Sequence, residues 1–162
     1  KNKKCLAYIV QKRGLKTYAF HRVLKSNNSN ALKKLIHLAK IKKTEKPNLL
    51  SNKIQFYVNK NWYIIEKKEK NQLIVNKLLQ NVLKPIFNIK DERANKKIQF
   101  VPGNKSINSI LKKLKSNEIF FLMKKIEIDN IIEIANKNET TPPKSTFILP
   151  KLPSGLIMME TE

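Results

Sequence analysis

A chain of 162 residues is long enough for one domain with a hydrophobic core, and an apolar fraction of 41% is too high for a disordered protein. The longest apolar run, Ile119 to Met123, is too short to cross a bilayer, and a single cysteine excludes an internal disulfide and favours a cytoplasmic location. The net charge of +22 admits a nucleic-acid partner, whereas two histidines beside one cysteine exclude a zinc site of the usual spacing.

The N-terminal part of the chain predicts two strands. Apolar residues dominate Cys5 to Gln11, which is typical of a buried strand. After a turn at Gly14, a second short strand is expected over Leu15 to Phe20, closed by His21 and Arg22.

A helix and a hairpin follow. Ser29 is a good N-cap for a helix whose leucines and isoleucines recur at i, i+3 and i+4. Residues 41–52 are a lysine-rich connector, and a possible sub-boundary within the single portion 1–162 lies near 42–53. Alternation on both sides of Asn59-Lys60-Asn61 predicts a β-hairpin, because asparagine tolerates positive φ.

The second half predicts a long amphipathic helix and then strands that alternate with helices. The helix begins near Val75 and stops near Pro85. The alternation predicts a βαβ unit with a parallel pair of strands. The fold class we expect is therefore α+β or α/β, with a mixed sheet, a central hairpin, this helix and a C-terminal βαβαβ-like unit. Its expected elements are strands at 98–101 and 119–123 and helices at 107–114 and 128–135.

A proline-rich segment, 141–157, closes the chain. Proline fixes φ and removes a backbone donor, so the segment is expected to be extended and stiff, with strands at 146–149 and 156–159. Lys144, Ser145 and Thr146 offer one cation and two hydroxyls, the groups that a phosphate contact needs.

Other candidate sites are weaker. His21 and Arg22 could join a general acid or base to a phosphate-binding guanidinium, or could be a surface histidine and a salt-bridged arginine. The loop 102–106 lies between a strand and a helix, but it lacks the glycines of a Walker motif, and we interpret it as an ordinary turn with a polar cap. No metal site is predicted.

The positive charge has two explanations. Clustered lysines bind phosphates without regard to sequence. However, only three of the 34 basic residues are arginine, and the abundance of lysine, asparagine and isoleucine is typical of an AT-rich bacterial genome. Because base-edge and bidentate phosphate recognition favour arginine, we favour solvated surface lysine over a nucleic-acid footprint.

Several stretches resemble an uncharacterised prokaryotic family, domain of unknown function 1015. The closing signature of that family is similar to Pro142–Phe147, Pro150-Lys151 and Ser154-Gly155-Leu156. Its strand-ending His-Arg motif, long helix, charged loop and following strand are similar to Phe20–Leu24, Leu73–Ile89, Asp91–Arg93 and Lys97–Val101. The loop has Asp-Glu-Arg where the family more often has Asp-Pro-Arg.

The resemblance implies a larger protein. Family members carry an upstream half with a Gly-His-His-Arg motif, similar to the phosphate-binding region of the ParB and sulfiredoxin superfamily, which includes free-serine kinases. The chain, which begins at Lys1, is therefore expected to be a C-terminal half whose partner is that upstream half.

Two function classes follow from the resemblance and the charge. The first is a cytoplasmic, nucleotide-dependent enzyme that transfers phosphate to a small metabolite such as serine, with ATP and Mg as cofactors. In it His21 and Arg22 are catalytic candidates, and the fragment alone is expected to be inactive. Its anion- or substrate-binding candidates are Lys144, Ser145, Thr146, Lys151 and Ser154. The alternative is a non-enzymatic, ParB-like nucleic-acid-binding protein or a purely structural module.

Overall fold

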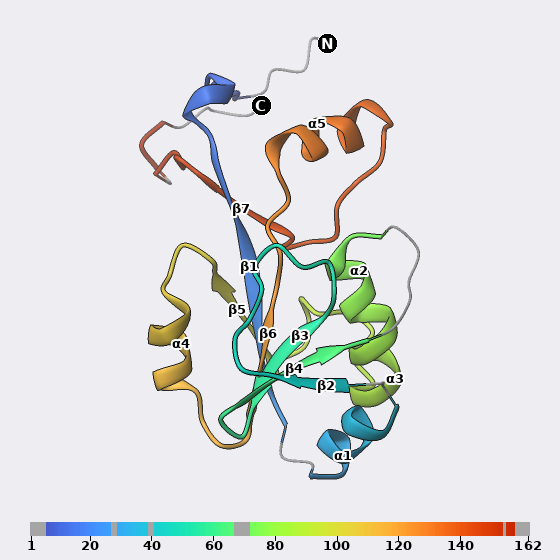
Figure 1. Ribbon diagram of the computed structural model, residues 1–162. Coiled ribbons are helices and arrows are strands. Elements are labelled where there is room, and N and C mark those ends of the chain that lie inside the picture. The colour runs from blue at the N-terminus through green and yellow to red at the C-terminus, as the bar shows by residue number, and fades with distance from the viewer. Residues whose placement is uncertain (1–5, 27–28, 39–40, 67–71, 154, 158–162) are drawn as a thin grey trace.

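The structure, a computed structural model, describes residues 6–26, 29–38, 41–66, 72–153 and 155–157. A seven-stranded sheet forms its centre, and helices cover both faces (Figure 1). This architecture confirms the α+β class. In the described part of the chain, no helix is long and apolar enough to span a membrane.

The sheet has the order β2-β4-β3-β6-β1-β5, and β7 pairs with β1 outside this path. Every strand pair among the described residues is antiparallel. The sheet takes strands from both sides of residues 42–53. Its strands are β1 (Lys16–Lys25), β2 (Ile41–Thr44), β3 (Gln55–Val58), β4 (Asn61–Ile65), β5 (Ile98–Pro102), β6 (Glu118–Leu122) and β7 (Thr146–Leu149).

Strand β1 holds the sheet together. Its N-terminal residues 16–19 pair with β7, residues 20–24 pair with β5, and residues 22–25 pair with β6. His21 and Arg22 thus lie in the middle of a ten-residue strand, not at the end of a short one as the sequence suggested. The strand continues because β5 and β6 supply hydrogen-bonding partners on both edges, which no local pattern reveals.

The predicted βαβ unit is present in split form. Strands β5 and β6 are joined through helix α4 (Ile107–Lys113), and both run antiparallel to β1. They are therefore parallel to each other, but β1 lies between them, so the expected direct parallel pair does not form.

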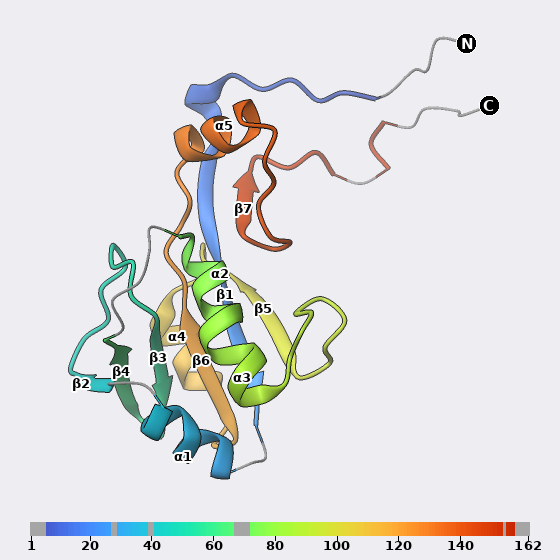
Figure 2. The same cartoon turned by 90° about the vertical axis from the view of Figure 1, so that its right-hand side faces the viewer.

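Helices cover the two faces unequally. One face packs on α1 (Ser29–Leu38), α2 (Ile74–Leu78) and α3 (Lys84–Phe87), around a core that includes Phe56 and Phe121. The other face packs on α4 around Trp62, Phe120 and Val23. Figures 1 and 2 show these two layers on either side of the sheet.

The predicted long helix runs past its expected stop. A π-helical segment, Leu79–Leu83, joins α2 to α3, and Pro85 lies just after it. A proline ring clashes with the carbonyl four residues earlier, and the wider π turn relieves that clash. The helix ends instead at Asn88, whose φ of 54° is the left-handed conformation that often closes helices.

The hairpin is confirmed by its turn. Asn59 and Lys60 have φ values of 49° and 61°. Positive φ at both central residues is the signature of a type I′ turn, which matches the twist of the two strands that it joins.

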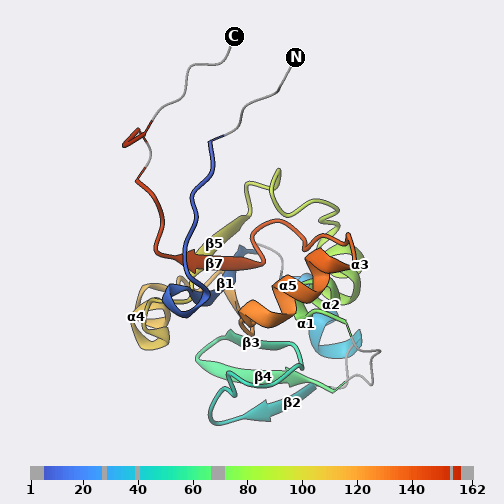
Figure 3. The same ribbon diagram turned by 90° about the horizontal axis from the view of Figure 1, so that it is seen from above.

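The ends of the chain differ from the predictions. Residues 6–10 form no strand, and Leu6, Tyr8 and Ile9 are exposed, because no described strand lies beside them. The connector, expected to have no regular structure, contains the edge strand β2. Of the last expected strand, 156–159, residues 156 and 157 belong to a bend, and residues 158 and 159 lie outside the described ranges. The described segments 6–11 and 150–153 leave the body on the same side, near β7 and helix α5 (Ile128–Asn136), as Figures 2 and 3 show.

A buried ion pair anchors the loop after α3 to the sheet. Arg22 is fully buried, and its Nε donates to Glu92 Oε2 over 2.8 Å. Glu92 is 8% exposed, so both charges lie away from water and depend on each other.

Replacing Glu92 by Ala should lower the free energy of unfolding by about 3–5 kcal/mol, because the Arg22 charge would stay buried without its partner. Urea unfolding measures this change. Glu133→Ala, which removes the carboxylate of an exposed ion pair with Lys137, is the matched control and should have little effect. Equal destabilisation by the two variants would contradict the role of burial.

Candidate functional site

His21 and Arg22 do not share a site. Successive side chains of a strand point to opposite faces of the sheet. Arg22 lies in register with Phe100 and Phe121, on the face covered by α1, α2 and α3. His21 lies opposite Val101 and contacts the Phe120 ring, on the face covered by α4.

The Arg22 guanidinium is held by the core. Its Nη1 donates to the carbonyl of Phe20, its Nε binds Glu92, and its Cζ lies 5.0 Å from the centre of the Phe100 ring. Burial lowers the pKa of Arg22, and the charge of Glu92 opposes that shift. Nη2 is buried and has no hydrogen-bond partner within the described residues.

His21 is a buried, neutral histidine. Its Nδ1 accepts a hydrogen bond of 3.1 Å from the backbone N–H of Met123, so the ring proton lies on Nε2. Burial, and then the charge of Arg22, lower the pKa of His21 to about 4. At neutral pH this imidazole therefore offers an N–H donor and not a base at Nε2.

The Nε2 side of His21 faces a pocket of about 310 Å³. Lys105 and Ser106 line it from the loop before α4, together with Asn108 of that helix. Gly103 lies at the closest approach: a Cβ there would be 2.8 Å from the Ala19 carbonyl and 3.2 Å from Nε2. Only glycine fits this position without displacing β1.

Two lysines of the proline-rich segment lie over aromatic rings. Lys144 Nζ is 5.4 Å from the centre of the Phe20 ring, and Lys151 Nζ is 4.4 Å from that of Phe147. The two rings meet edge to face with centres 5.5 Å apart. Cations over ring faces are positioned without being neutralised. Lys144 also has a φ of 57°, a conformation that is unfavourable for a residue with a side chain.

The remaining candidates of the segment differ in exposure. Ser145 is buried, and its hydroxyl donates to the carbonyl of Pro142, so it supports the local turn. Thr146 Oγ1 is buried and has no hydrogen-bond partner in the described ranges. Thr146 lies opposite Ala19 of β1, on the same sheet face as His21. Ser154 lies outside the described residues.

Sequence reasoning underrated the loop before α4. It placed Lys105 and Ser106 in an ordinary turn, whereas pairing of β5 with β1 brings this loop to His21. The sequence does show a glycine-containing loop between a strand and a helix. That this loop lies beside His21 depends on the pairing of two strands about 80 residues apart in the sequence.

The described part of the chain holds no group of three or more His, Cys, Asp or Glu side chains that could bind a metal. The cations that suit phosphate groups are Lys144 and Lys151 on one side and Lys105 on the other.

The likeness to known proteins is one of fold. No family model matches the sequence, and no curated protein is significantly similar to it. SbnI from Staphylococcus aureus is 9% identical, with a TM-score of 0.53 over 90% of this chain and 54% of that one. A conserved hypothetical protein from Pyrococcus furiosus is 16% identical, with a TM-score of 0.53 over 84% of this chain and 56% of the other.

A free serine kinase, solved with ADP and with AMP, is 15% identical with a TM-score of 0.49; the match covers 84% of this chain and 54% of the kinase. This chain thus spans little more than half the length of these structures. At such identities only the fold is shared, and membership of the domain of unknown function 1015 family stays a prediction.

The neutral state of His21 should make the protein less stable in acid. Above the ordinary pKa of 6.5 the ring is neutral in both folded and unfolded states; as the pH falls from 6.5 towards 4, only the unfolded state gains a proton. Stability should therefore decrease over this window by about 3 kcal/mol. Urea unfolding at several pH values measures it, and His21→Asn, whose amide oxygen can accept the Met123 N–H, should remove this contribution. An equal pH dependence in the variant would contradict the assignment.

Gly103→Ala should destabilise the fold by about 1–3 kcal/mol, because the new methyl group would press on the backbone of β1. Gly14→Ala is the control: its nearest neighbour is a Val10 side-chain atom at 3.8 Å, and its effect should stay below about 1 kcal/mol. Thermal melting compares them, and an equal effect would show that the approach at Gly103 is not restrictive.

Proposed function

We propose that this chain is the C-terminal half of a cytoplasmic, nucleotide-dependent phosphotransferase that acts on a small metabolite such as free serine. In this proposal the strip formed by β7 and the N-terminal half of β1 faces the upstream half of the protein, and its lysines contact phosphate groups. The resemblance to the domain of unknown function 1015 family motivates the proposal, and one arrangement on this strip carries it.

That arrangement is the pair of lysines over the joined Phe20 and Phe147 rings. Neither Lys144 nor Lys151 forms an ion pair with a described carboxylate, so both remain available to an anion. The rings fix the two ammonium groups above one sheet surface. Because phosphoryl transfer depends chiefly on positioning and on cations that stabilise charge, fixed lysines are suited to it.

The uncovered apolar surface at this end of the molecule supports the presence of a second body. Helix α5 is amphipathic, yet none of its residues is buried. Most of the large hydrophobic side chains that are exposed in the described ranges gather around this end, and the side chain of Ile9 is 91% exposed. They are Leu6, Tyr8, Ile9, Ile132, Leu156 and Ile157. Packing of another part of the protein would remove this surface from water.

In this proposal His21 and Arg22 have separate roles, whereas the sequence suggested that they act together as a catalytic pair. Arg22 contacts Phe100, whose ring meets that of Phe20, on the same face of the sheet as the two lysine-bearing rings. His21, on the opposite face, would donate Nε2–H to an anion held with Lys105. A nucleotide and Mg²⁺ would add, respectively, the transferred phosphoryl group and charge neutralisation when bound.

Isothermal titration of the natural full-length protein with ATP, ADP, AMP and serine tests the proposal. We expect nucleotide binding that weakens about tenfold in Lys144→Ala, because a charged hydrogen bond to phosphate is lost. Lys144→Arg keeps the cation and should retain most of the affinity. Lys90→Ala, a charge change at an exposed position away from the strip, is the control. The absence of heat with every nucleotide would refute the function, and unchanged affinity in Lys144→Ala would refute the site.

A further inference from the structure

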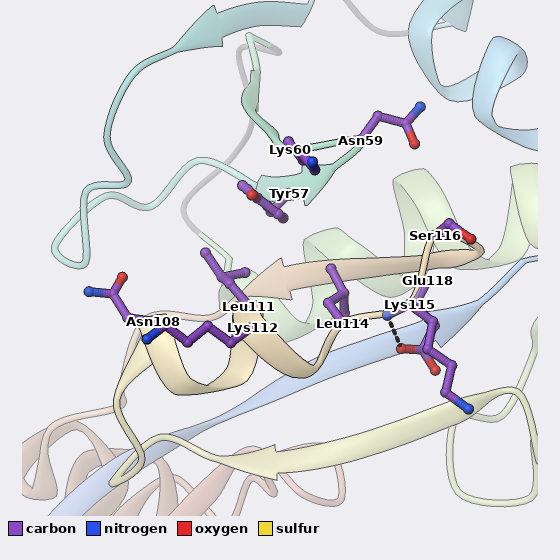
Figure 4. Close-up of a pocket in the computed structure, with 10 residues that line it drawn as sticks. All are labelled: Tyr57, Asn59, Lys60, Asn108, Leu111, Lys112, Leu114, Lys115, Ser116 and Glu118. Carbon is purple, nitrogen blue, oxygen red and sulfur yellow. Dashed lines mark hydrogen bonds between the residues drawn. The ribbon is translucent and has the colours of Figure 1, made fainter.

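A second hollow lies away from the strip, between the hairpin and α4. It has a volume of about 850 Å³. Figure 4 shows the turn of the hairpin on one side, with Tyr57 and Lys60, and α4 on the other, with Leu111 and Lys112. We call it the α4 groove. The residues of the strip do not line it.

The floor of the α4 groove is apolar and contains an aromatic ring. Tyr57, Leu111 and Leu114 pack on the core cluster of that sheet face and stay half-exposed towards the groove. The ring of Tyr57 is held by Trp62, with centres 5.2 Å apart and an angle of 61°. A fixed, half-exposed ring beside two leucines is a suitable surface for a flat aromatic ligand.

The rim of the groove is positively charged. The side chains of Lys60, Lys112 and Lys115 are exposed, and no ion pair within the described residues neutralises them. Glu118 is the single carboxylate in the lining; it is buried, and its Oε2 accepts the backbone N–H of Lys115 over 3.0 Å. The groove therefore suits a ligand that combines flat rings with negative charges.

The lysines are spaced along the groove and not gathered at one point. In Figure 4, Lys112 extends along α4 towards Asn108, Lys115 lies near the other end of the hollow with its side chain pointing away from the hairpin, and Lys60 lies across from them. Asn108 lines this groove and also the pocket beside His21, which adds Lys105 to the same path. Cations at intervals along an aromatic floor match a ligand with repeated phosphates.

We propose that the α4 groove binds single-stranded nucleic acid. A base stacks on Tyr57 against Leu111 and Leu114, and the phosphates run past Lys60, Lys112 and Lys115 towards Lys105. Stacking and lysine contacts tolerate any sequence. The only arginines are Arg13, Arg22 and Arg93, and none of them lines the groove, so selective reading of base edges is not expected.

Fluorescence anisotropy of a labelled oligothymidine of about 12 nucleotides, added to the full-length protein at physiological salt, tests the proposal. Tyr57→Leu should weaken binding about tenfold, since one stacked base is lost. The triple variant K60A/K112A/K115A should bind more weakly and reduce the slope of log K against log salt by about 2. Emission of Trp62, the only tryptophan, should change on binding, because its ring contacts Tyr57.

A matched triple variant separates the groove from general charge. K33A/K34A/K96A removes three exposed lysines elsewhere and should leave affinity and salt slope nearly unchanged. Equal losses in both triples would overturn the proposal in favour of diffuse attraction to a chain of charge +22. Equally tight binding of duplex DNA, or full competition by thymidine monophosphate, would overturn the single-strand ligand. Lys144→Ala should leave oligonucleotide affinity unchanged, so this result and that for phosphotransfer are independent.

Discussion

The fold depends on the pairing of β1 with three other strands. Its ten residues hold β5 and β6 on opposite edges and carry β7 beyond them. Successive side chains of a strand point to opposite faces of the sheet. Alternate side chains of β1 therefore face the core under α1, α2 and α3, and the others face the core under α4. The proposed α4 groove borders the second of these cores.

The two neighbouring ionisable residues of β1, His21 and Arg22, are buried on opposite faces of the sheet and in opposite charge states. Arg22 keeps its charge and is matched by Glu92, whereas His21 loses its charge and is matched by a backbone N–H group. The pair, which the sequence presents as a chemical unit, is thus divided by the sheet. Groups able to meet an external anion lie further out: Lys144 and Lys151 over their rings, and the lysines around the α4 groove.

Local sequence patterns predicted where several helices and turns lie, but the pairing of strands far apart in the sequence determines which residues become neighbours. Helical spacing located α4 and α5, and Asn59-Lys60 located the hairpin turn, because each depends on neighbouring residues alone. The apolar stretch at residues 6–10 was wrongly predicted as a strand, because alternation does not reveal whether a partner strand exists. The role of Lys144 as a phosphate contact, inferred from its motif, stays a prediction. The period of two could have separated His21 from Arg22, but the approach of Lys105 to His21 follows only from the pairing of β1 with β5.

The split arrangement of β5, β1 and β6 also sets an order for synthesis. Strand β1 precedes its partners β5, β6 and β7 in the chain, and the last of these partners is complete only when residue 149 has been made. During that interval an apolar strand with two open edges is exposed to other chains, the situation in which nascent proteins aggregate. His21 and Arg22 interrupt its apolar run at the centre, and such polar residues act as gatekeepers against intermolecular pairing. The two side chains that are buried in the folded core therefore also disfavour aggregation of β1 before its partner strands have been made.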